Sequence, residues 1–202
     1  ELVPVLDDQE APLPFTLEVA DEQLNAQLRE ALFRPSAASL QVGTEPRSLV
    51  FEYEDSGGLR VRKEYRFDPQ NEPFVVRFSA SVRTSRGVVN PVVRWGPGLG
   101  SSTAGGFGFT YSQPSQAIFY REEDVSRLDR SDLEETPAYE GTFGFVGVDD
   151  HYFLSAALPD TNSAEVNYRP VTLGSGDDQL VLIDYSLQFA EPPTETRFYM
   201  GP

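Results

Sequence analysis

Residues 48–67 read SLVFEYEDSGGLRVRKEYRF, and this stretch decides the expected fold. Apolar and polar side chains alternate over Ser48–Glu54 and again over Gly58–Phe67, on either side of the turn-forming sequence Asp55-Ser56-Gly57-Gly58. Alternation with a period of two places the apolar side chains of a strand on one face, and glycine-rich sequences form the tight turns of hairpins. The stretch therefore predicts a β-hairpin with one apolar face.

The same period of two recurs along most of the chain. It predicts further strands over Phe15–Val19, Phe74–Arg83, Gln179–Ala190 and Thr196–Met200, and a short edge strand over Leu2–Leu6. In the two longest of these ranges, alternation turns one set of side chains inward: Phe74, Val76, Phe78, Ala80, Val82, Val181, Ile183, Tyr185, Leu187 and Phe189. We expect these side chains to form the core of packed sheets.

Helical spacing is confined to a small part of the sequence. Asp21–Phe33 has leucines on one helical face and an acidic first turn, and Pro35 follows just past its end, so we expect a short helix there. Arg121–Glu135 is highly charged and carries few apolar residues, so we expect a solvated loop with one helical turn. The sequence thus predicts one or two short helices.

The fold class follows from the number and spacing of the strands. Many short strands separated by clusters of Gly, Pro, Asn and Asp are typical of packed antiparallel sheets and not of alternating β and α units. A length of 202 residues fits one domain with a sizeable core. We therefore predict a single all-β domain over residues 1–202.

Composition excludes several classes of function. The net charge of -16 opposes binding to nucleic acid and to anionic membrane surfaces. The chain has no cysteine, which removes disulfides, thiolate metal sites and cysteine nucleophiles. No segment approaches the roughly 20 apolar residues of a membrane-spanning helix. We expect the chain by itself to be soluble and monomeric.

The search for catalytic groups centres on the only histidine, His151, which follows Asp149 and Asp150. Histidine is the side chain most readily used for proton transfer near neutral pH, but an active site needs convergent partners, and the sequence offers none. We interpret residues 143–159 instead as two strands joined by a turn at Asp149-Asp150. His151 then opens a second strand that is buried on both faces through Leu158 and closed by Pro159.

Other chemical patterns are incomplete. Lysine chemistry would rest on Lys63, the only lysine, and its sequence surroundings do not indicate a catalytic pocket. Trp95–Gly100 (WGPGLG) lacks the third glycine of a dinucleotide loop and is interpreted as a kinked turn. The acidic pairs Asp7-Asp8, Asp149-Asp150 and Asp177-Asp178 lack calcium-loop spacing, and the last is expected to form a hairpin turn. The sequence therefore predicts no catalytic residue, no cofactor site and no metal site.

Aromatic side chains cluster around a glycine-rich stretch, and two interpretations of them stay open. Phe107, Phe109, Tyr111, Phe119 and Tyr120 could form a platform for an apolar or sugar ligand. Aromatic residues also favour strands, and at a period of two they commonly form the inner face of a sheet.

Three segments, in this order and at this approximate spacing, resemble a known family. They are Trp95–Gly100, Phe143–Pro159 (FGFVGVDDHYFLSAALP) and the ending Phe198–Pro202 (FYMGP). Together they resemble the large periplasmic domain of the bacterial membrane protein insertase YidC. The resemblance extends over nearly the whole chain. The chain starts on Glu1 and ends directly after a strand-like run, so we expect it to be excised from a longer membrane protein.

The resemblance implies a β-supersandwich of twisted antiparallel sheets, similar in architecture to galactose mutarotases. It also implies a periplasmic location, within an inner-membrane protein that inserts and helps fold membrane proteins, alone or with the Sec translocon. The insertion machinery of that family lies in the membrane core, so no functional residue carries over to this chain. We expect a non-catalytic domain that contacts SecD, SecF or nascent membrane proteins.

Two alternative functions stay open at this point. The shared architecture suggests a carbohydrate-binding domain, although sugar epimerases of that architecture use a histidine pair with a glutamate, and this chain has one histidine. The other alternative is an inert spacer, which the sequence does not distinguish from an interaction domain.

Overall fold

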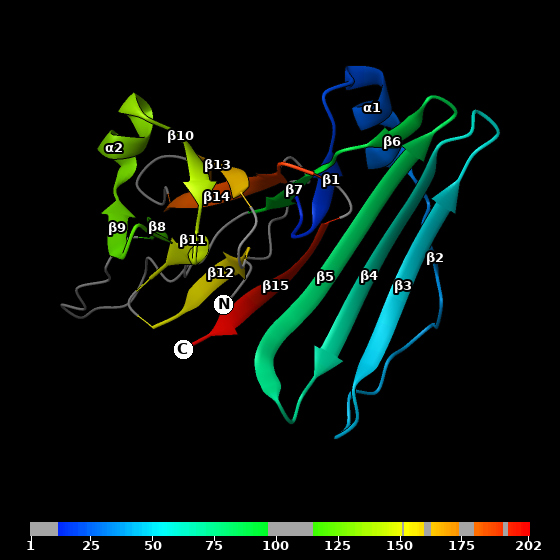
Figure 1. Ribbon diagram of the computed structural model, residues 1–202, viewed down its shortest axis with the longest axis horizontal. Coiled ribbons are helices and arrows are strands. Elements are labelled where there is room, and N and C mark those ends of the chain that lie inside the picture. The colour runs from blue at the N-terminus through cyan, green and yellow to red at the C-terminus, as the bar shows by residue number, and fades with distance from the viewer. Residues whose placement is uncertain (1–11, 97–114, 151, 160–162, 174–179, 192–193) are drawn as a thin grey trace.

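The computed structural model describes residues 12–96, 115–150, 152–159, 163–173, 180–191 and 194–202 (Figure 1). The helices described in these ranges are α1 (Glu22–Glu30) and α2 (Arg130–Glu135). The strands are β1 (Thr16–Glu18), β2 (Arg34–Pro35), β3 (Arg47–Glu54), β4 (Arg60–Asp68), β5 (Glu72–Thr84), β6 (Gly87–Val89), β7 (Val92–Trp95), β8 (Gln116–Arg121), β9 (Asp124–Leu128), β10 (Ala138–Thr142), β11 (Phe145–Asp149), β12 (Leu154–Leu158), β13 (Ser163–Leu173), β14 (Leu180–Phe189) and β15 (Thr194–Gly201).

The described strands form two antiparallel sheets. One sheet has five strands in the order β1-β7-β14-β13-β10. The other has ten strands, in the order β2-β3-β4-β5-β15-β12-β11-β8-β9 with β6 paired to β5. In Figure 1, β3, β4 and β5 are long neighbouring strands that extend away from the five-stranded sheet. The predicted all-β sandwich with short helices is confirmed.

The core lies between the two sheets and contains aromatic side chains from both. Phe15, just before β1, meets the rings of Phe78, Trp95 and Phe198 at centroid distances of 4.7, 4.9 and 4.9 Å. Phe78 and Phe198 lie on the ten-stranded sheet, and Trp95 lies on the five-stranded sheet. Edge-to-face and tilted pairs of this kind add to the stabilisation that burial alone provides.

A tyrosine hydroxyl also links the sheets. Tyr168 of β13 is buried, and its hydroxyl donates to the Ile118 carbonyl (2.8 Å) and accepts from the Gly147 N–H (3.3 Å). Burial raises the pKa of Tyr168 well above its ordinary value. Gly147 itself allows the close approach of β12, because a Cβ there would meet the Ser155 carbonyl and the Ala156 backbone.

The hairpin predicted from residues 48–67 is confirmed by β3 and β4. They pair antiparallel with Tyr53 opposite Val61 and Glu54 opposite Arg60. The Asp55 carboxylate accepts from the Leu59 N–H (2.9 Å), and Gly58 has a φ of 87°, a conformation that glycine adopts without strain.

The prediction for β5 is correct for four of the five side chains expected to point inward. Val76, Phe78, Ala80 and Val82 are buried, but Phe74 is 48% exposed. The register of β4 against β5 shifts at Phe67/Asp68, and β5 curves strongly at its start (Figure 1). A bulge of this kind re-aims the side chains beyond it.

The first helix is shorter than predicted. Asp21 caps α1 by accepting from the backbone N–H groups of Gln23 and Leu24, as an N-cap residue does. Ala31 is extended, so the helix stops before Leu32, which is 90% exposed. The chain then continues into β2, which begins at Arg34, so the helix ends before the helical spacing of the apolar residues does.

The interpretation of Arg121–Glu135 as a loop with one helical turn is wrong for its first half. Asp124–Leu128 is strand β9, joined to β8 by Glu122 and Glu123, whose φ values are 54° and 66°. Two residues with positive φ make a tight hairpin turn, and glutamate is an unusual residue for it. The second half is the six-residue helix α2, which Asp129 caps.

The run around the histidine forms two strands, β11 and β12, as predicted, but the second begins at Leu154. The Asp150 carboxylate accepts from the N–H groups of Tyr152 and Phe153 (2.8 Å each), which keeps these two residues out of the strand. Tyr152 is therefore 72% and Phe153 38% exposed, contrary to the prediction that they are buried. Burial on both faces holds for Ser155, Ala156 and Ala157.

Several predictions fall outside the described residues. They are the edge strand Leu2–Leu6, the turn at Pro97–Gly100, the aromatic residues Phe107, Phe109 and Tyr111, the histidine His151, and the acidic pairs Asp7-Asp8 and Asp177-Asp178.

Candidate functional site

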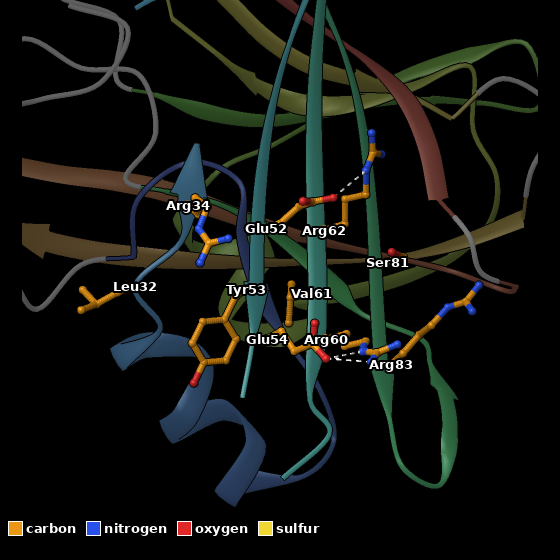
Figure 2. A pocket seen from close by; sticks show the side chains of 10 residues that line it. All are labelled: Leu32, Arg34, Glu52, Tyr53, Glu54, Arg60, Val61, Arg62, Ser81 and Arg83. Atoms are coloured by element: carbon orange, nitrogen blue, oxygen red, sulfur yellow. Dashed lines mark hydrogen bonds and ion pairs between the residues drawn. The ribbon is translucent and has the colours of Figure 1, made fainter. Parts of the chain in front are cut away.

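A pocket of about 550 Å³ opens on the ten-stranded sheet at the end formed by β2, β3, β4 and β5, which we call the arm (Figure 2). Its lining is mostly charged and consists of Leu32, Arg34, Glu52, Tyr53, Glu54, Arg60, Val61, Arg62, Ser81 and Arg83. Four arginines and two glutamates give the lining a net charge of +2, on a chain whose net charge is -16. The pocket therefore stands out electrostatically from the rest of the protein.

Strand register brings these side chains together. Arg34 pairs with Glu52, Glu52 with Arg62, and Arg62 with Ser81, which forms one row across all four strands. A second row runs from Glu54 through Arg60 to Arg83. Side chains opposite one another in neighbouring strands lie on the same face of a sheet. Both rows thus point to the outer face of the arm, away from the buried Val61 and Val82.

Two arginines in the pocket are neutralised by glutamates. Arg60 contacts Glu54 through Nε (2.8 Å) and Nη2 (2.7 Å). Arg62 contacts Glu52 at 3.6 Å and Glu64 at 2.8 Å, and its hydrogen bond lowers the pKa of Glu64.

Arg34 and Arg83 differ from these two arginines. Within the part of the chain that the structure describes, neither has an acidic partner. Their guanidinium groups provide planar, permanently charged donors that suit carboxylates or phosphates. The pocket therefore offers two guanidinium groups as donors to an anionic ligand. It lacks the aromatic walls of a typical sugar site.

The acidic residues beside the histidine have structural roles. Asp149 accepts from Arg127 Nε (2.9 Å), and the Asp150 carboxylate forms the turn described above. Among the residues that the structure describes, no group of three or more His, Cys, Asp or Glu side chains can hold a metal ion.

The burial of Lys63 was not predicted from the sequence. Lys63 lies between the inward-facing Val61 and Tyr65, and its Nζ donates to the Phe15 carbonyl (3.0 Å) and stands 4.9 Å from the ring centroid of Phe33. Burial lowers its pKa from 10.5 to about 8. Its position in the alternating pattern of β4 indicates a side chain that points inward. Its contacts hold the segment before β1 against the sheet.

A buried carboxylate on the other sheet is also satisfied internally. Asp184 of β14 accepts from Arg94 (3.2 Å) and Arg169 (2.8 Å), and Arg94 also contacts Glu18 of β1 at 2.8 Å. These contacts link four strands, and a buried carboxylate needs such partners.

The described members of the aromatic cluster favour the core interpretation. Phe119 is buried and packs on Tyr139 (4.9 Å) and Phe143 (5.6 Å). The guanidinium of Arg121 stands 5.6 Å from the Phe119 ring centroid and 5.9 Å from that of Phe143. Tyr120 is half-buried and stacks on Phe145.

Comparison with known families gives the identification. The sequence model of the YidC periplasmic domain matches residues 4–202. The chain belongs to this family. The resemblance seen in three segments of the sequence is thereby confirmed over essentially the whole chain. A comparison with curated proteins gave no match.

Membership places this YidC periplasmic domain in the periplasm, as part of a membrane protein insertase. The family is not known as catalytic. Within the described ranges, no helix is both long and apolar enough to cross a membrane.

Proposed function

We propose that this periplasmic domain is a non-catalytic contact module of its insertase. In this proposal the insertase inserts and helps fold membrane proteins, alone or with the Sec translocon. The domain contacts the Sec accessory subunits SecD and SecF, or nascent membrane proteins, through the outer face of the arm.

The observation that carries the proposal is the charged pocket of the arm. Its opposed rows of arginine and glutamate offer directional, charge-assisted hydrogen bonds, which give protein contacts their specificity. The charged groups described elsewhere, Lys63, Asp149 and Asp184, are engaged in holding the fold.

Sugar binding is the competing function, and the lining of the pocket does not favour it. Tyr53 is the single aromatic side chain among the lining residues. Carbohydrate sites commonly combine apolar or aromatic walls with a few polar groups. Calorimetric titration with a panel of sugars checks this: the proposal predicts flat traces, and micromolar binding would establish a carbohydrate-binding domain in its place.

Photo-crosslinking in the intact insertase tests the proposal directly. A photoreactive residue at position 81, in the pocket, is compared with one at position 124, the first residue of β9, at the far end of the same sheet. Ser81 and Asp124 are the residues replaced. We expect adducts with SecD, SecF or a nascent chain from position 81 and none from position 124. The absence of specific adducts from position 81 would overturn the proposal.

A further inference from the structure

The two arginines without acidic partners stand on opposite sides of the pocket. In Figure 2, Arg34 lies beyond β3 on one side and Arg83 beyond Arg60 on the other, with the Glu54–Arg60 and Glu52–Arg62 pairs between them. Arg83 is also directly opposite Arg60 in the register of β4 and β5. Because Glu54 already balances the charge of Arg60, a carboxylate placed beside Arg83 would balance the charge of Arg83 in the same way.

The distance between Arg34 and Arg83 sets the spacing that two carboxylates of a partner need in order to reach both. Three strand spacings, roughly 14 Å, separate β2 from β5, and Arg83 lies two residues beyond Ser81, which is level with Arg34, so the two backbone positions are roughly 16 Å apart. An extended peptide advances about 3.3 Å per residue, so two carboxylates four residues apart lie on the same side of the peptide and about 13 Å from each other, and the long arginine side chains span the remaining distance. The glutamates between the two sites disfavour further acidic residues in the intervening positions.

We propose that this pocket binds an extended acidic segment of a protein partner, with one carboxylate on Arg34 and a second on Arg83, about four residues apart. The inference rests on the proposed contact function and specifies the chemistry of the partner. Leu32 at the rim is 90% exposed and offers an apolar contact beside Arg34.

A protein segment fits the pocket better than an anionic membrane surface. A bilayer presents a broad, flat negative surface, and contact with it brings many acidic side chains of this domain, whose net charge is -16, into its field. The potentials of a bilayer and of a single carboxylate are both screened beyond the Debye length, about 8 Å at physiological salt, so a carboxylate inside the pocket acts mainly on its immediate neighbours. Local attraction by Arg34 and Arg83 is thus available to a peptide without the repulsion that a bilayer meets.

The test uses a fluorescein-labelled peptide of glycine and serine with two aspartates four positions apart, and fluorescence anisotropy with the 202-residue chain. The matched control peptide carries asparagine at both positions. The double variant Arg34→Gln/Arg83→Gln is compared with Arg47→Gln/Arg86→Gln. This control removes the same charge from two exposed arginines outside the pocket lining.

We expect the aspartate peptide to bind the wild type and the control variant, and to bind Arg34→Gln/Arg83→Gln about tenfold more weakly, since tenfold corresponds to about the sum of two exposed ion pairs. We expect the asparagine peptide not to bind. Equal binding of both peptides, or of both variants, would overturn the inference.

Vesicles that contain phosphatidylglycerol serve as a second probe in a sedimentation assay. We expect no co-sedimentation, and binding that depends on Arg34 and Arg83 would show that the pocket is a lipid headgroup site and overturn the inference. The two proposals fail separately. If photo-crosslinks from position 81 persist while Arg34→Gln/Arg83→Gln changes neither them nor peptide binding, the contact function stands and the acidic segment is wrong.

Discussion

Replacing Lys63 with methionine is predicted to remove a rise in stability that the wild type shows between pH 7 and pH 9.5. Burial of the ammonium lowers the pKa of Lys63 from 10.5 to about 8 in the folded protein. Below pH 8 both the folded and the unfolded state carry the proton, and the folded state bears the cost of a charge removed from water. Above pH 8 the folded state loses the proton first, so the free energy of unfolding rises with pH.

The expected size follows from the pKa difference. A difference of about 2.5 pKa units corresponds to at most about 3 kcal/mol over the full titration, at 1.36 kcal/mol per unit. About 2 kcal/mol of this falls between pH 7 and pH 9.5. Tyrosines act in the opposite direction at higher pH, since burial raises the pKa of Tyr65 to about 12. The measurement therefore stops at pH 9.5.

Urea denaturation measures the effect, with fluorescence of the single tryptophan, Trp95, as the signal. Trp95 is buried, with its ring stacked between Tyr185 and Phe198, so its emission reports loss of the core. The wild-type free energy of unfolding should rise by about 2 kcal/mol relative to Lys63→Met over this range. Lys63→Arg, which stays charged, should also lack the rise. Parallel pH profiles for the wild type and Lys63→Met would contradict the lowered pKa of Lys63.

Three further predictions concern the arm, the sheet contact and the histidine. Arg83→Glu places an acid opposite Arg60, whose charge Glu54 already balances, so it should change the free energy of unfolding by no more than about 0.5 kcal/mol while abolishing binding of the aspartate peptide; a larger loss of stability in urea or retained anisotropy would contradict it. Gly147→Ala puts a Cβ against the Ser155 carbonyl and should lower the free energy of unfolding by about 3 kcal/mol. Gly43→Ala, with open space at its Cβ, should be nearly neutral in the same urea assay, and a neutral Gly147→Ala would contradict this prediction. His151→Gln should leave the activity of the full-length insertase near normal in a complementation assay, and complete loss in a stably folded variant would be the opposite result.

Local sequence patterns predict the strands of this fold well where alternation and turn chemistry coincide. Residues 48–67 contain both, and the hairpin of β3 and β4 forms with the predicted inner face. The same patterns fail where backbone geometry departs from the typical residue preferences. Glu122 and Glu123 adopt positive φ without glycine or asparagine, and the Asp150 side chain extends a turn into a run of apolar residues.

The charged pocket was not predictable from the sequence because it depends on the register between separate strands. Glu52 and Arg62 share a hairpin, so their pairing can be anticipated, but Arg34 and Ser81 join the row from strands whose positions no local pattern specifies. Lys63 is different, since its place in the alternation of β4 predicts that it points inward. Lysine is rarely buried in proteins, so its residue type argues against an inward position although the alternation favours one.

Photo-crosslinking from position 81 in the intact insertase, carried out in the wild type and in the two double-arginine variants, tests the central claim that the arm pocket contacts a protein partner. We expect adducts with SecD, SecF or a nascent chain in the wild type and in Arg47→Gln/Arg86→Gln, and a strong loss of these adducts in Arg34→Gln/Arg83→Gln. The absence of specific adducts from this position in every background would contradict the account.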